Sequence, residues 1–92
     1  MHEHVLMRDV VARVDEIARA EGAARVTKVG VRLGALSHFT ADHFRAHFAD
    51  AARGTIAEGA AVDAVLEEDP GDARAGDVLL ELVEVELPDG SP

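Results

Sequence analysis

The first four residues of the chain, Met1-His2-Glu3-His4, place nitrogen donors at the spacing that a metal chelate requires. Because His2 is bulky, we expect Met1 to be retained and to carry the terminal amine. That amine, the deprotonated backbone amide of His2 and the imidazole of His2 can close two adjacent chelate rings in one plane. Tetragonal, nitrogen-rich coordination suits Ni(II) or Cu(II) and suits zinc poorly. A fourth position remains for Glu3, His4 or an outside donor; the alternative is an ordinary terminus that contains histidine.

A second set of candidate ligands lies in the middle of the chain. His43, His47 and Asp50 are spaced at i, i+4 and i+7, which places them on one stripe of a predicted helix. Two histidines at this spacing can chelate a divalent metal, and Asp50 would add an oxygen donor. His38 falls in the turn before that helix and is a further candidate. The alternatives, which we favour, are a solvated helix flank and a plain turn residue.

Other arrangements of polar residues do not support a catalytic site. The stretch 67–77 contains four carboxylates, at Glu67, Glu68, Asp69 and Asp72. They lack the spacing and the glycine of an EF-hand loop, so a solvated loop is predicted. Ser37, His38 and Asp42 are too close in sequence to form a relay, and no elbow motif surrounds Ser37. We therefore predict that the chain is not an enzyme.

The composition narrows the classes of partner. The 92 residues carry a net charge of −9, which disfavours nucleic acid and anionic membranes as partners. No apolar run approaches the roughly 18 residues that a transmembrane helix needs, and no secretion signal is visible. We therefore expect a cytoplasmic protein. Hydrophobic residues make up 48% of the chain, enough for a core, and cysteine is absent, which excludes thiolate ligands and cysteine nucleophiles.

Hydrophobic periodicity predicts two helices and three strands. The helices are expected at 4–20 and 41–52, and the strands at 25–33, 61–66 and 78–87. Gly22 is the expected stop signal of the first helix. The order helix–strand–helix–strand–strand implies an α+β fold, in which two helices pack on one face of a three-stranded mixed sheet. The loop of about ten residues between the last two strands is compatible with an antiparallel hairpin.

Several stretches of the sequence, taken in order, resemble the hydrogenase nickel-incorporation accessory proteins, the HypA/HybF family. They are Met1-His2-Glu3, the stretches 24–29 and 31–37, the stretch 53–60 and the closing strand 76–85. Each stretch alone is only moderately specific, whereas their common order and spacing is a strong indication.

This resemblance implies a function and a set of ligands. The protein would be a nickel metallochaperone that supplies a nickel enzyme, hydrogenase or in some lineages urease, together with a GTPase partner called HypB. The nickel ligands of the family map to the amine of Met1, the imidazole and amide of His2, and Glu3. Among the residues that could replace a missing donor, His4 is nearest in sequence; His38, His43 and His47 are the other candidates.

The chain departs from the family in one large respect. Family members carry a zinc domain with two Cys-x-x-Cys pairs, inserted between the last two strands. Here the acidic loop 67–77 stands in that place, and the sequence has no cysteine. We therefore expect a single nickel-binding domain, residues 1–92, without a structural zinc site.

Two hypotheses of different classes follow. The leading one is a delivery factor that holds Ni(II) at its N-terminus and hands it over by ligand exchange. Its affinity should fall as the pH falls, because the imidazole must be neutral and the amide deprotonated. The competing one is a metal-free interaction or regulatory module, derived from the same fold, that docks a partner on its exposed sheet face or its first helix.

Overall fold

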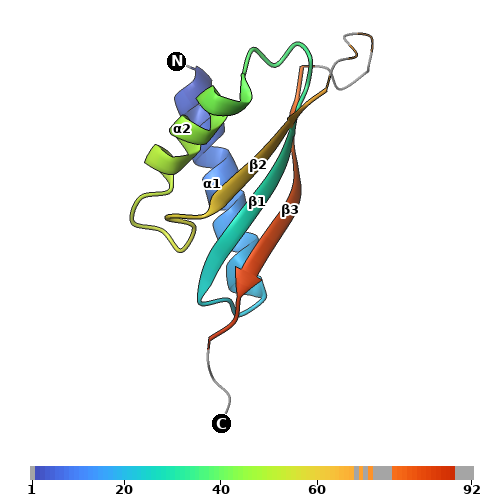
Figure 1. Cartoon of the computed structure of the whole chain (residues 1–92). Helices are drawn as coiled ribbons and strands as arrows, with labels where there is room; N and C mark the ends of the chain where they lie inside the picture. The colour runs from blue at the N-terminus through green and yellow to red at the C-terminus, as the bar shows by residue number, and fades with distance from the viewer. Residues whose placement is uncertain (1, 68, 70, 72–75, 89–92) are drawn as a thin grey trace.

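The computed structural model describes residues 2–67, 69, 71 and 76–88, with side chains from residue 5 onward. In chain order the elements are α1 (His2–Ala20), β1 (Arg25–Leu33), α2 (Ala41–Ala51), β2 (Ala61–Leu66) and β3 (Val78–Glu86) (Figure 1). The predicted α+β class is confirmed, with two helices and a three-stranded mixed sheet. The first helix begins at His2, two residues earlier than the periodicity indicated.

The sheet has the order β2-β1-β3, with β1 parallel to β2 and antiparallel to β3. The last two strands therefore do not form the hairpin that the loop length suggested. They flank β1 on opposite sides, and β1, the central strand, is the most buried of the three. The backbone N–H of Glu67 donates to the carbonyl of Leu33 at 2.8 Å, and that of Gly34 donates to Asp77 at 2.9 Å. Both ends of the acidic stretch are thus joined to the end of β1.

The core is mostly aliphatic and lies between the sheet and the helices. α1 contributes its buried stripe at spacings of four and three residues, β1 its inward side chains and α2 two phenylalanines. The buried residues of these three elements are Met7, Val11, Val14, Ala18, Val26, Val29, Val31, Leu33, Phe44 and Phe48. Val26 faces the core although its parity differs from that of Val29, because a register shift between Val26 and Lys28 reverses the alternation.

Local signals fix the ends of both helices. The N–H of Ala23 donates to Ala18, and that of Gly22 to Arg19, both at 3.0 Å. These two hydrogen bonds, together with the left-handed backbone of Gly22 at φ 71°, form a Schellman motif. The predicted end of α1 is therefore confirmed. The side chain of Thr40 caps α2, whose C-terminal cap is Ala52. Within the described residues, neither helix is long and apolar enough to cross a membrane.

Candidate metal site

The predicted ligand set lies at the very beginning of α1. The backbone of His2–His4 forms the first turn of this helix. Met1 and the side chains of His2, Glu3 and His4 lie outside the described residues, so their role as ligands stays a prediction. The position of the backbone is informative nonetheless. A helix uses none of its first four N–H groups as internal donors, so coordination by the His2 amide would break no helical hydrogen bond.

The structure brings two of the candidate histidines together on α2. The imidazole centroids of His43 and His47 are 4.4 Å apart, and the two rings are inclined by 64°. Both side chains are half-buried. Phe39, which is itself 7% exposed, packs against His43 with a centroid distance of 5.5 Å. The prediction that His43 and His47 share one stripe is therefore confirmed.

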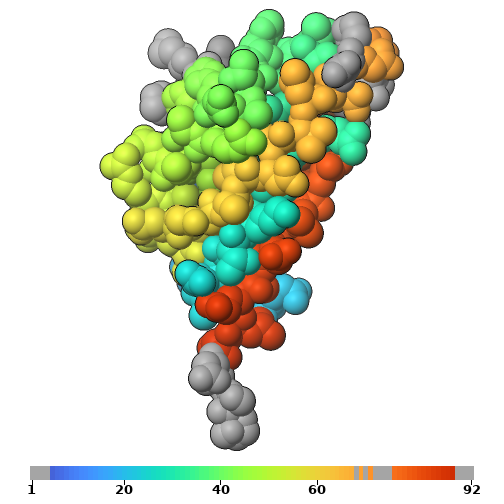
Figure 2. Space-filling model, in the orientation of Figure 1, coloured from blue at the N-terminus to red at the C-terminus, as the bar shows by residue number. Residues whose placement is uncertain are grey.

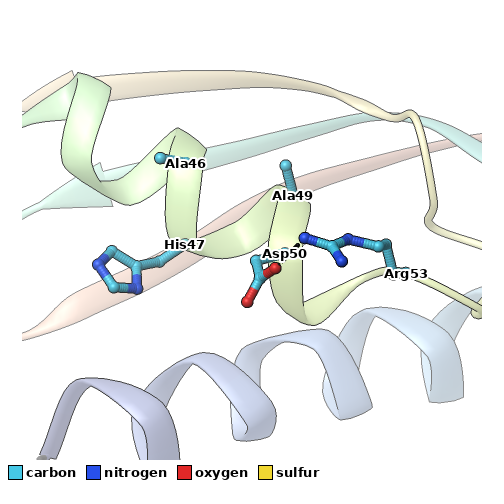
Figure 3. Close-up of a pocket in the computed structure, with 5 residues that line it drawn as sticks. All are labelled: Ala46, His47, Ala49, Asp50 and Arg53. Carbon is cyan, nitrogen blue, oxygen red and sulfur yellow. Dashed lines mark hydrogen bonds and ion pairs between the residues drawn. The ribbon is translucent and has the colours of Figure 1, made fainter.

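The third member of that stripe is engaged elsewhere. The carboxylate of Asp50 pairs with the guanidinium of Arg53, one turn further along the chain. His47, Asp50 and Arg53 help to line a shallow hollow of about 370 Å³. In Figure 3 the Asp50–Arg53 pair lies at one end of the lining residues and His47 lies at the other. Among the described residues, no group of three or more histidines and carboxylates could hold a metal ion. The idea of a self-contained site made of His43, His47 and Asp50 is therefore wrong.

His38, the remaining candidate histidine of the central segment, differs from His43 and His47 in its backbone conformation. It adopts a left-handed backbone with φ 68°, uncommon for a residue with a Cβ, and its side chain is exposed. The neighbouring Ser37 hydroxyl is buried and has no hydrogen-bond partner within the described part of the chain. Asp42 pairs with Arg45 at 2.8 Å. A relay of Ser37, His38 and Asp42 is therefore not formed, as the sequence spacing indicated.

The first carboxylate of the acidic stretch, that of Glu67, forms an ion pair. Arg32 on β1 donates to Glu81 on β3 and to Glu67 after β2, at 2.9 Å in each case. The hydrogen bond to Glu81 contributes most, and that to Glu67 contributes next, to raising the pKa of Arg32 above its ordinary value. Glu68 and Asp72, two of the predicted loop carboxylates, lie outside the described residues, and Asp69 accepts from the backbone of Gly71 at 2.9 Å.

The fold belongs to the class of small α+β domains in which two helices pack on a three-stranded mixed sheet. Residues 1–75 match the family described as hydrogenase/urease nickel incorporation, metallochaperone, hypA. The chain belongs to this HypA family, so the resemblance read from the sequence is confirmed.

The sequences of two hydrogenase maturation factors align with a large part of this chain. It is 44% identical over 63 residues to the hydrogenase maturation factor HypA of Methylocella silvestris, an alignment that covers 68% of this chain and 56% of that protein. It is 38% identical over 74 residues to the factor of the same name from Chlorobaculum tepidum, an alignment that covers 80% of this chain and 64% of that protein. The chain therefore spans only about three fifths of the length of these relatives.

The fold has a counterpart among solved structures. The solution structure of the nickel metallochaperone HypA from Helicobacter pylori matches with a TM-score of 0.77, covering 92% of this chain and 97% of that chain. The sequence identity of this match is 17%, so the likeness supports the fold and no finer property.

Proposed function

We propose that this protein is a non-catalytic nickel-delivery factor that binds Ni(II) at the N-terminus of α1. The observation that carries the proposal is the combination of two facts. The chain belongs to a family described as a nickel-incorporation metallochaperone family, and its sequence opens with the candidate ligands Met1-His2-Glu3-His4 where the helix α1 begins, at His2. The recipient would be the precursor of a nickel enzyme, hydrogenase or urease, in the cytoplasm.

The chemistry of the site follows from its donors. In a chain that begins at Met1, the amine, the amide of His2 and its imidazole would occupy three positions of a plane, and Glu3 or His4 could approach the ion. The partial positive charge of a helix start disfavours a cation slightly but assists the deprotonation of the amide. A planar site that is open above and below allows an incoming donor to attack, which suits transfer by ligand exchange.

The same proposal accounts for the acidic stretch. Residues 67–77 would take the place of the family's zinc domain, so that residues 1–92 act as one nickel-binding domain without structural zinc. Because both ends of this stretch are joined to the end of β1, a segment there can vary in length without disturbing the core. The proposed partners are a HypB-like GTPase and the enzyme precursor; nucleic acid and membranes are not proposed.

The test is a calorimetric titration of untagged protein with Ni(II). The informative variant is His2→Gln, because an alanine at this position would allow removal of Met1 and would leave His4 as the third residue of a new chelating terminus. His2→Gln should lose most of the nickel affinity and keep its far-UV dichroism, since no core side chain is altered. His38→Asn removes an exposed imidazole elsewhere and should bind as the original chain does. Equal affinities of the His2→Gln variant and the original chain would rule out the site.

One observation favours the second candidate function, a metal-free docking module. In Figure 2, β2, β1 and β3 lie side by side on a face that no helix covers. On these strands Val65 and Leu82 are 52% and 45% exposed, and exposed apolar side chains on a sheet face are groups that a docked partner would cover. If docking were the whole function, acetylation of the terminal amine would leave enzyme maturation in the host cell unchanged. Loss of maturation would favour nickel delivery.

A further inference from the structure

One flank of α2 carries two imidazoles and faces away from the sheet edge. The Nε of Arg45 donates to the carbonyl of Val62 at 3.0 Å, so the flank that carries Arg45 lies over β2. At about 100° per residue, His43 and His47 fall on the opposite side of the buried Phe44 stripe. The imidazoles are therefore on the flank of α2 that is turned away from β2.

That flank is turned toward α1. α2 packs against α1 as well as against β2. His43 and His47 are half-buried, whereas Ala46 and Ala49, on the outer face of the same helix, are exposed. In Figure 1 the first turns of α1 lie beside α2, and in Figure 3 His47 extends toward the side on which α1 begins. The two imidazoles thus lie on the flank of α2 that is turned toward the side on which the helix α1 begins.

The pair is held in place by its surroundings. Phe39 lies against His43 and is fixed in turn by an edge-on contact with Phe44, at a centroid distance of 5.6 Å. The backbone N–H of His43 donates to the Thr40 hydroxyl, which holds the first turn of α2. Two histidines one helical turn apart are a known chelating arrangement for divalent metals. Because the rings are already close, little ordering would be needed for one of them to bind an ion.

We propose that His43 and His47 belong to the nickel site, and that an imidazole of this pair fills the coordination position left open by the N-terminal nitrogens. The inference rests on the proposed function. Nickel binding would then connect α1 to α2.

The experiment uses the full chain beginning at Met1 and Ni(II) alone as the probe. The variant is His43→Gln/His47→Gln, with far-UV dichroism as the check of folding and His38→Asn as the matched control. The double variant should still bind one ion per chain. Its affinity should fall by at least about tenfold, the lower end of the roughly 10–100-fold effect of removing even an outer-shell partner. Its d–d band should move to lower energy as water replaces a nitrogen donor.

The outcomes separate this inference from the proposed function. If the double variant keeps the affinity and the absorption band of the original chain while His2→Gln loses them, the inference is overturned and the N-terminal site stands. If His2→Gln binds as the original chain does, the N-terminal site is overturned, and the shared site with it. If each single histidine variant is nearly neutral and only the double variant is weakened, either ring can fill the position, which supports the inference.

Discussion

The hydroxyl oxygen of Thr40 accepts a hydrogen bond from the backbone N–H of His43 at 3.1 Å. Thr40 has the extended backbone of an N-cap, so this bond satisfies one of the free N–H groups at the start of α2. The substitution Thr40→Ala should lower the free energy of unfolding by about 1 kcal/mol, measured by urea denaturation. Thr40→Ser keeps the acceptor and should cost much less. Equal losses for the two variants would contradict the capping role.

Gly30 on β1 is paired with Leu82 on β3. A Cβ at this position would lie 3.0 Å from the Cβ of Leu82, which is tighter than nine in ten real Cβ contacts. Gly30→Ala should therefore lower the free energy of unfolding by about 1–3 kcal/mol through overpacking. In a double-mutant cycle, Leu82→Gly should remove part of that cost, so the two losses should not add. Gly76→Ala, where a Cβ meets no atom within 4 Å, is the control and should be nearly neutral.

Arg32 on β1 forms ion pairs with Glu81 on β3 and with Glu67, the residue that follows β2. Because the pKa of Arg32 is raised in the folded state, this stabilisation is fully present below the ordinary arginine pKa and is lost only as the pH rises through the raised value. Arg32→Gln should therefore lower the urea midpoint by the same small amount at every pH near neutrality. The side chain is 43% exposed, so added salt should shrink the effect.

The control for this experiment removes an equal charge elsewhere. Arg8→Gln alters an exposed position on α1 and should change the midpoint less than Arg32→Gln does. A loss for Arg32→Gln that grows with salt, or that varies steeply with pH around neutrality, would contradict the assignment.

The fold was largely predictable because its signals are local. The alternation of β1 and the glycine stop of α1 correctly predicted the elements. The pairing of β3 was not predictable, because a loop of ten residues permits either edge of β1 or the edge of β2. The burial of Val26 depends on a register shift, which arises only when β3 is in place. The buried Ala57 was missed because it lies in an irregular segment between glycines, where no periodicity marks the core side.

The candidate site was predictable in part. The spacing of His43 and His47 fixed their common flank, since helix geometry alone decides it. Which neighbour that flank faces depends on how α2 packs between β2 and α1, and this is a tertiary property. The engagement of Asp50 by Arg53 could have been suspected from their i, i+3 spacing. The terminal ligand set came from donor chemistry and from the family resemblance, and it remains a prediction for experiment.

The most direct test of the central claim compares Ni(II) binding by the chain with a free Met1 amine and by the same chain acetylated at that amine. Acetylation is the suitable block, because adding a single residue would place His2 third and create another chelating terminus. The account predicts one tightly bound ion per chain with a d–d absorption band for the free amine. It predicts loss of that band and an affinity lower by at least about tenfold after acetylation. Identical titrations and spectra for the two forms would contradict it.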